Sequence, residues 1–138
     1  MTDAWNPTQY HRFADQRSAA FHDLLDLIQP IPGGRAVDLG CGSGELTVLL
    51  AHRTSAAEVI GLDSSPAMLA EAATHERVGL HFAEGDLALW GDRQPAVDLV
   101  VANASLQWVP DHQSVLQRWT ASLAAGGQLG LRPMRWCR

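Results

Sequence analysis

The chain alternates between short hydrophobic runs and longer segments in which hydrophobic residues recur at helical spacing. Five short runs predict β-strands, at residues 36–39, 58–62, 78–83, 97–102 and 128–131. Ahead of the first run, after the first and second runs, and between the fourth and fifth, hydrophobic residues three and four positions apart predict amphipathic helices. Strands that are apolar along their length and alternate with helices form parallel sheets. The pattern therefore predicts an α/β fold, with a mostly parallel sheet and helices on both faces.

Helix boundaries are marked by residues with strong positional preferences. Ser65 followed by Pro66 is typical of an N-cap and a first helical residue. Asp111 is expected to cap a later helix, whose apolar face extends to Leu123. The glycine pair at 126–127 is expected to end that helix.

The length and composition of the chain fit one domain of ordinary size. The chain has 138 residues, of which 46% are hydrophobic and 18% are charged, so a packed core is expected. We divide it into an N-terminal arm and helix at 1–30, a central core at 31–131 and an atypical basic tail at 132–138.

Charge and cysteine content argue against several classes of protein. The formal net charge is −5 and the basic residues are scattered, which disfavours a nucleic acid partner. The first residues lack the basic and apolar regions of a signal peptide, and no apolar run approaches the roughly 20 residues of a membrane helix. The 2 cysteines form no disulfide framework, and the 6 histidines lack the spacing of metal ligands. We therefore expect a cytoplasmic protein without membrane association or a metal.

A turn with three glycines, Gly40, Gly42 and Gly44, joins the first predicted strand to the next helix. Glycine lets the chain turn tightly, and it lets a ligand approach the backbone where a Cβ would obstruct it. The helix N-terminus adds free N–H groups. The turn indicates a ligand site, although such a motif taken alone also fits a tight connection without a ligand.

An acidic residue at the end of the second strand sharpens this interpretation. Asp63 follows the glycine turn at about the 20-residue interval at which a carboxylate reaches a ribose hydroxyl. A carboxylate there accepts hydrogen bonds from vicinal hydroxyls and repels phosphate. Alternatively, Asp63 caps the helix that begins near Ser65, a role that is compatible with ribose binding.

Polar residues also follow the third and fourth strands. Asp86 is suited to accept a hydrogen bond from the exocyclic amine of adenine, and it fits equally well as a turn residue after Gly85. Asn103 ends the fourth strand, where open α/β sheets bind ligands. Trp108 is suited either to contact a cation through its ring and exclude water, or to anchor the core.

The spacing of the glycines separates two classes of nucleotide ligand. They follow Gly-x-Gly-x-Gly rather than the Gly-x-Gly-x-x-Gly of dinucleotide sites, and Asp38 lies two positions before Gly40. The pyrophosphate of NAD is disfavoured beside that carboxylate. A sulfonium with an α-amino group tolerates or prefers it, so the turn favours S-adenosylmethionine as the cofactor.

Taken together, these motifs resemble the class I S-adenosylmethionine-dependent methyltransferases. The resemblance covers residues 35–131 and rests on four motifs in the same order. They occupy residues 37–44, 61–66, 84–87 and 102–109. Trp5-Asn6-Pro7 followed by Tyr10, Phe13 and Arg17 resembles the entry segment of the trans-aconitate 2-methyltransferase group, which methylates a carboxylate of a small tricarboxylic acid.

The resemblance implies a Rossmann-like fold and a role for each matching residue. It implies that the residues binding the methyl donor are Asp38, Gly40, Gly42, Asp63, Asp86, Asn103 and Tyr10. Asp63 would hold the ribose and Asp86 the adenine, while Tyr10 closes over the donor or meets the substrate. Arg17 and Trp108 would lie on the substrate side, where a guanidinium pairs bidentately with a carboxylate. Alternatively, Arg17 is a solvent-facing helix residue.

The C-terminus departs from the family pattern. The family continues after the fifth strand into a substrate-facing segment and a closing pair of strands, whereas this chain ends at Arg138 after a basic stretch. Pro133 in that stretch lacks the backbone N–H that a residue in a central strand donates to its neighbour. We therefore expect the C-terminal strands and much of the acceptor pocket to be missing. An uncovered fifth strand and Trp136 favour self-association.

The resemblance implies methyl transfer to a carboxylate of a small organic acid such as trans-aconitate. An anionic oxygen needs no general base, so no catalytic acid or base is assigned. Holding the two reactants in the right position and orientation would account for roughly 7–11 kcal/mol of the activation barrier. Three alternatives stay open: a donor-binding module without turnover, a methyltransferase for another small acceptor, and a nicotinamide-dependent oxidoreductase, which the glycine spacing disfavours.

Overall fold

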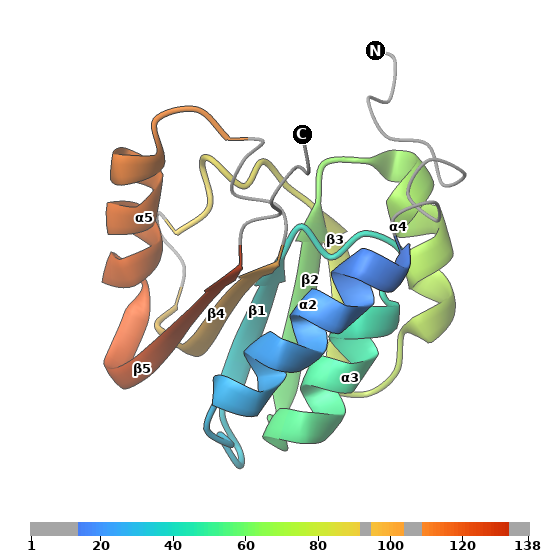
Figure 1. The fold of residues 1–138 in the computed structure, drawn as a ribbon, viewed down its shortest axis with the longest axis horizontal. Helices are drawn as coiled ribbons and strands as arrows, with labels where there is room; N and C mark the ends of the chain where they lie inside the picture. Colours follow the sequence, from blue (N-terminus) through green and yellow to red (C-terminus); the bar gives the residue numbers. More distant parts are fainter. Residues whose placement is uncertain (1–13, 92–94, 104–108, 133–138) are drawn as a thin grey trace.

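A five-stranded parallel sheet forms the centre of the molecule (Figure 1). The computed structural model describes residues 14–91, 95–103 and 109–132, and the side chains from residue 18 onward within these ranges. The strand order is β3-β2-β1-β4-β5, and every neighbouring pair is parallel. The strands are β1 (Arg35–Leu39), β2 (Glu58–Asp63), β3 (Leu80–Glu84), β4 (Val97–Asn103) and β5 (Leu123–Arg132).

Helices precede β1 and follow β1, β2 and β4, and they cover both faces of the sheet, as the hydrophobic pattern predicts (Figure 1). The helical elements are α2 (Ala14–Leu27), α3 (Glu45–Thr54), α4 (Pro66–Ala72), the short 3₁₀ helix η1 (Ala73–His75) and α5 (His112–Ala121). Ser65 caps α4 through its side chain, which accepts from the backbone N–H of Met68, and Pro66 is the first helical residue. Asp111 caps α5 in the same way. Among the described residues, no helix is both long and apolar enough to cross a membrane.

Two hydrophobic clusters lie on opposite faces of the sheet because successive strand residues point to alternate sides. Ala36 of β1 and Leu99 of β4 belong to the cluster that contains residues of α2 and α3. Their neighbours Val37 and Val100 belong to the cluster that contains Trp119 of α5. Central strands with both faces buried explain the apolar runs in the sequence.

The end of α5 and the start of β5 differ from the sequence-based prediction. The helix ends at Ala121, not at the glycine pair, and Leu123 already pairs with Val97 in the sheet. The next pair is Leu99 with Gln128, so residues 124–127 bulge out of β5. Within this bulge Gly126 has a φ of 78°, a left-handed conformation that glycine adopts without strain. The glycines therefore accommodate a bulge within the strand.

The third strand also begins later than predicted. Residues 78–83 are an apolar run, yet β3 spans Leu80–Glu84 and Val78 is fully exposed. Gly79 has a φ of 83°, outside the range of an extended strand. The hydrophobic run therefore includes a turn residue that the pattern alone cannot distinguish from a strand residue.

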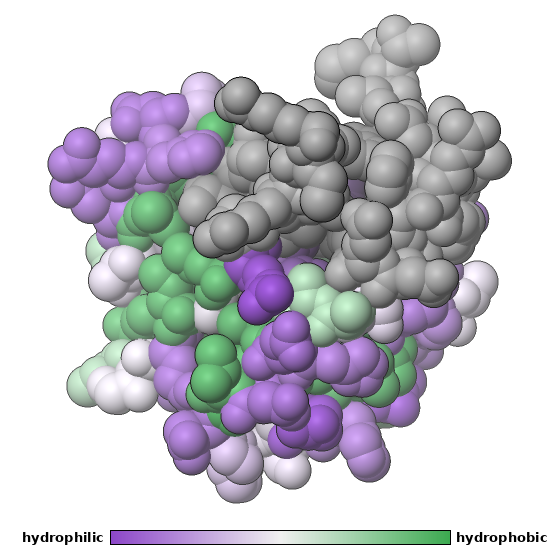
Figure 2. All heavy atoms as spheres, viewed as in Figure 1, coloured by the Kyte–Doolittle hydropathy of each residue, from purple (hydrophilic) through white to green (hydrophobic). Residues whose placement is uncertain are grey.

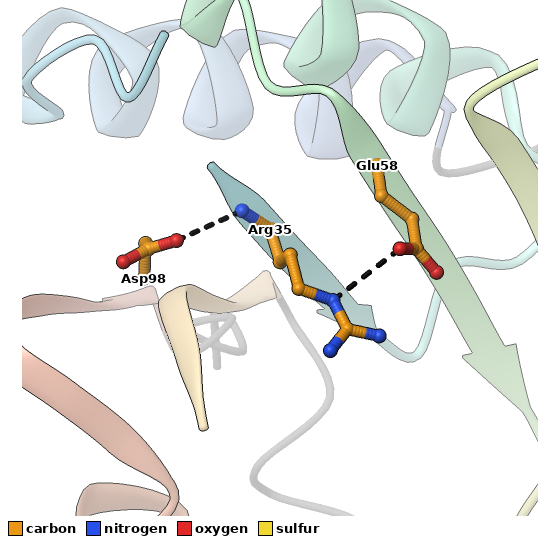
Figure 3. Close-up of polar contacts among 3 residues, drawn as sticks. All are labelled: Arg35, Glu58 and Asp98. Carbon is orange, nitrogen blue, oxygen red and sulfur yellow. Dashed lines mark hydrogen bonds and ion pairs between the residues drawn. The ribbon is translucent and has the colours of Figure 1, made fainter. Parts of the chain in front are cut away.

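The amino ends of the central strands are joined by Arg35 (Figure 3). Its backbone N–H donates to Oδ2 of Asp98 at 2.9 Å, and its Nε lies 3.3 Å from Oε2 of Glu58. These contacts connect β1 to both neighbouring strands at the edge opposite to the carboxyl ends.

Hydrophobic surface gathers on the side of the molecule where β5 and α5 lie (Figure 2). Leu129 and Leu131 of β5 are only half-buried. Within the described residues, β5 pairs with β4 alone, so its other side forms an edge of the sheet.

Candidate functional site

The polar residues singled out from the sequence follow or end neighbouring strands at the carboxyl edge of the sheet. Asp38 lies in β1 in register with Gly61, Asp63 is the last residue of β2, and Asn103 is the last residue of β4. Asp86 follows β3 by two residues. Because parallel strands end on the same side of a sheet, this edge brings together three carboxylates and an amide.

The glycine turn after β1 is held against the end of β2. The backbone N–H groups of Gly40 and Cys41 both donate to the carbonyl oxygen of Leu62, at 2.7 and 3.0 Å. Gly40 and Gly42 have φ values of 83° and 57°, which residues with a Cβ rarely adopt. The sequence requires glycine here because the backbone is left-handed, independently of any ligand.

Asp63 points toward this turn. Its Oδ2 accepts from the backbone N–H of Gly42 at 2.9 Å, and its Oδ1 accepts from the backbone N–H of Ser65 at 2.9 Å. The carboxylate thus links the glycine turn to the start of α4. The alternative role as the cap of this helix falls to Ser65, and Asp63 instead accepts from the backbone N–H of that cap residue. A carboxylate has about four acceptor positions, so two such bonds leave capacity for hydroxyl donors.

Asp38 is held by a residue that sequence reasoning missed. The hydroxyl of Thr47, in the first turns of α3, donates to Oδ2 of Asp38 at 2.7 Å, and both side chains are buried. The bond fixes the carboxylate behind the glycine turn. The sequence could have indicated a contact here, because Thr47 is a polar residue next to Leu46 and lies on the buried side of α3.

Asp86 lies in a short turn between β3 and β4. Its Oδ1 accepts from the backbone N–H of Ala88 at 2.9 Å, and its carbonyl oxygen accepts from those of Leu89 and Trp90. The side chain is exposed. The backbone N–H of Gly85 donates to the carbonyl oxygen of Asp63 at 3.0 Å, which joins the turn to the end of β2.

The remaining predicted site residues differ in what the structure describes of them. Asn103 is buried at the end of β4, in register with Arg132. Arg17 lies within α2, but its side chain is outside the described part. Tyr10 and Trp108 lie outside the described residues altogether.

The chemistry of this edge matches a cationic, hydroxyl-bearing ligand. Clustered carboxylates attract an ammonium or sulfonium group and accept hydrogen bonds from sugar hydroxyls, whereas they repel phosphate. Among the described residues, no group of three or more histidine, cysteine, aspartate or glutamate side chains is arranged to hold a metal ion.

Comparison with known families identifies this architecture. Residues 36–127 match the model of a methyltransferase domain. The chain belongs to the methyltransferase domain family. The match spans the strands and turns described above, from β1 to the bulge in β5.

Curated relatives of the chain carry a more specific name. It is 47% identical over 128 residues to a trans-aconitate 2-methyltransferase of Deinococcus radiodurans, covering 93% of this chain and 48% of the relative. It is 46% identical over 136 residues to a trans-aconitate 2-methyltransferase of Streptomyces avermitilis, covering 94% of this chain and 50% of the relative. The chain therefore spans about half the length of the curated relatives that it matches.

Solved structures share the fold. An S-adenosylmethionine-dependent methyltransferase from Mesorhizobium loti superposes with a TM-score of 0.72 at 32% identity, covering 82% of this chain and 52% of that one. A complex of DhpI with SAM superposes with a TM-score of 0.69 at 27% identity, covering 86% of this chain and 54% of that one.

Proposed function

We propose that this chain binds S-adenosylmethionine at the carboxyl edge of its sheet and provides the donor site for methyl transfer to a carboxylate of a small organic acid. The observation that carries the proposal is the position of Asp63, whose carboxylate faces the glycine turn through its bond to Gly42. Had the side chain turned away from that turn, no acidic group from β2 would face a ligand lying along it.

The residues present fit the donor part by part. Gly40 and Gly42 leave the backbone without Cβ atoms where the methionine part would pass, and Asp38 lies behind them as the nearest acidic group of β1. Asp63 would accept from the ribose hydroxyls, and Asp86 from the amine of adenine. Asn103 and Tyr10 would complete the donor pocket.

The reaction needs positioning more than acid or base catalysis. When bound, S-adenosylmethionine supplies a methyl group on a positively charged sulfur, which keeps the electron pair of the broken C–S bond. The carboxylate oxygen of the acceptor forms the new bond to the methyl carbon, and a methyl ester results without any proton transfer. The protein's own contribution is to hold both reactants in line and to exclude water.

The names of the relatives support a small acid as the acceptor. We propose trans-aconitate, with Arg17 pairing with a carboxylate of the acid and Trp108 lining the acceptor side. We place the protein in the cytoplasm, whose reducing conditions suit the buried thiol of Cys41.

Calorimetric titration tests the donor site. We expect S-adenosylmethionine and S-adenosylhomocysteine to bind with one-to-one stoichiometry and NAD to give no heat of binding. Saturable binding of NAD without binding of the methyl donor would overturn the assignment, because it would show that the turn accepts a pyrophosphate.

Turnover is tested separately. The full 138-residue chain is incubated with S-adenosylmethionine and trans-aconitate, and methyl ester is quantified by mass spectrometry. Ester formation supports the acceptor proposed here. Donor binding without ester identifies a donor-binding module, and ester with a different small acid replaces trans-aconitate as the acceptor.

A further inference from the structure

The turn that carries Asp86 is fixed both by its own backbone hydrogen bonds and by hydrogen bonds from another element. Inside the turn, the backbone N–H groups of Leu89 and Trp90 donate to the carbonyl oxygen of Asp86, at 3.0 and 3.1 Å. These bonds use the carbonyl of Asp86 and leave those of Leu87 and Ala88 to be satisfied by other groups.

Two consecutive residues of α5 satisfy these carbonyls. The indole Nε1 of Trp119 donates to the carbonyl oxygen of Leu87 at 3.1 Å, and a guanidinium N–H of Arg118 donates to that of Ala88. The two donors come from a helix about thirty positions later in the chain, and their consecutive placement fixes the turn at two adjacent points.

Packing reinforces the same attachment. Trp119 is fully buried and Trp90 is nearly so, and both belong to the hydrophobic cluster beneath α5. Gly91 ends the turn with a φ of 110°, and a Cβ there would lie 2.8 Å from Cγ of Arg118. The stem of the arginine therefore passes directly over the glycine.

We infer that Arg118 and Trp119 are positioning residues for recognition of the base: they hold the turn so that the carboxylate of Asp86 stays at the carboxyl edge beside Asp63. The inference rests on the function proposed above, in which Asp86 accepts from the amine of adenine. Neither α5 residue contacts the ligand in this scheme.

The alternative is that these contacts only stabilise the fold. A loss of stability would weaken every ligand to the same extent, whereas displacement of Asp86 would weaken selectivity for the base. The ratio of two affinities separates the cases, because effects common to both ligands cancel in it.

The experiment compares S-adenosylhomocysteine with S-inosylhomocysteine, in which a carbonyl oxygen replaces the amine of adenine. A carboxylate accepts from the amine but repels the carbonyl oxygen. We expect the unmodified chain to prefer the adenine compound by about tenfold or more. Asp86→Asn should reduce or invert this preference, because an amide can donate to the carbonyl oxygen.

Arg118→Met is the decisive variant because it keeps a hydrocarbon stem over Gly91 and removes the guanidinium donor. We expect its preference for adenine to fall by about threefold or more, as for the loss of one modest hydrogen bond. Arg118→Lys, which retains a donor, should recover part of the preference. Gln117→Ala changes an exposed neighbour on the same helix and should leave the preference unchanged. Arg118→Leu, which also lacks a donor, replaces the methionine variant if that protein aggregates.

The outcomes separate the inference from the proposed function. If the unmodified chain binds neither compound, the proposed function fails and the inference fails with it. If the chain binds with a preference for adenine that Arg118→Met and Arg118→Leu both retain, the function stands and the positioning role is wrong. A preference that survives Asp86→Asn also overturns the inference, because Asp86 would then not contact the base.

Discussion

The backbone N–H of Gly42 donates to the carboxylate of Asp63 at 2.9 Å, so the glycine turn after β1 and the last residue of β2 hold each other in place. The bond gives Asp63 a structural role in addition to the proposed ribose-binding role. A substitution at this position therefore changes both the stability of the turn and the affinity for the donor, and the experiment has to measure both.

Asp63→Asn should lower the affinity for S-adenosylmethionine about tenfold to a hundredfold, the range expected when hydrogen bonds to a charged acceptor are lost. The amide also turns one donor toward the N–H groups of Gly42 or Ser65, so a loss of about 1–3 kcal/mol in unfolding free energy is expected. Titration calorimetry and urea denaturation measure the two effects. Glu84→Gln, which changes the exposed residue in register with Asp63 on β3, is the matched control. Equal losses of affinity in both variants would contradict a specific role for Asp63.

Gly61 of β2 lies where the ring of Phe82 passes close to the backbone. A Cβ at Gly61 would lie 2.6 Å from Cδ1 of that ring and 2.9 Å from Cβ of Cys41. Gly61→Ala should therefore destabilise the protein by about 1–3 kcal/mol, the usual cost of overpacking. Phe82→Leu in the same chain should recover part of this loss, since the smaller side chain relieves the contact. Additive effects of the two changes in urea denaturation would contradict this explanation.

Much of the fold follows from the hydrophobic pattern because parallel strands are buried on both faces. The pattern failed where glycine alters the backbone: Val78 precedes Gly79 in a turn, and Gly126 permits a bulge within β5. In both places a long-range contact decides the outcome, namely the pairing of β3 with β2 and of Leu123 with Val97. Such pairings are not visible in a window of neighbouring residues.

The site was predictable to the extent that it depends on strand ends. Asp63 could be expected beside the glycine turn because parallel strands end at the same edge. The bonds of Thr47 and Arg118 could not be expected, because they depend on the rotation and placement of helices relative to the sheet. Sequence spacing indicates which face of a helix is buried but not which polar atom on that face meets a partner.

Thr47→Val tests the bond to Asp38. The substitution keeps the shape of the side chain and removes its hydroxyl. The buried carboxylate of Asp38 therefore loses this hydrogen-bond donor. We expect a loss of about 1.5–3 kcal/mol in unfolding free energy, typical of a hydrogen bond to a charged group. Thr47→Ser should retain most of the stability. Thr54→Val is the control, because the hydroxyl of Thr54 donates to the neutral carbonyl of Leu50 and about 1 kcal/mol is expected. A smaller loss at Thr47 than at Thr54 would contradict the prediction.

The contacts of Arg35 predict unequal effects at the opposite edge of the sheet (Figure 3). Asp98→Ala removes the acceptor of the backbone N–H of Arg35, which is partly buried, so a loss of about 1–3 kcal/mol is expected. Glu58→Gln weakens an ion pair whose side chains are 39% and 38% exposed, and solvent screening limits its contribution to about 0–1 kcal/mol. Denaturation in low and high salt distinguishes the two, since only the effect of Glu58→Gln should diminish as salt is added. An equal loss in both variants at high salt would contradict the prediction, because the ion pair would then contribute as much as the backbone bond and would not be screened by salt.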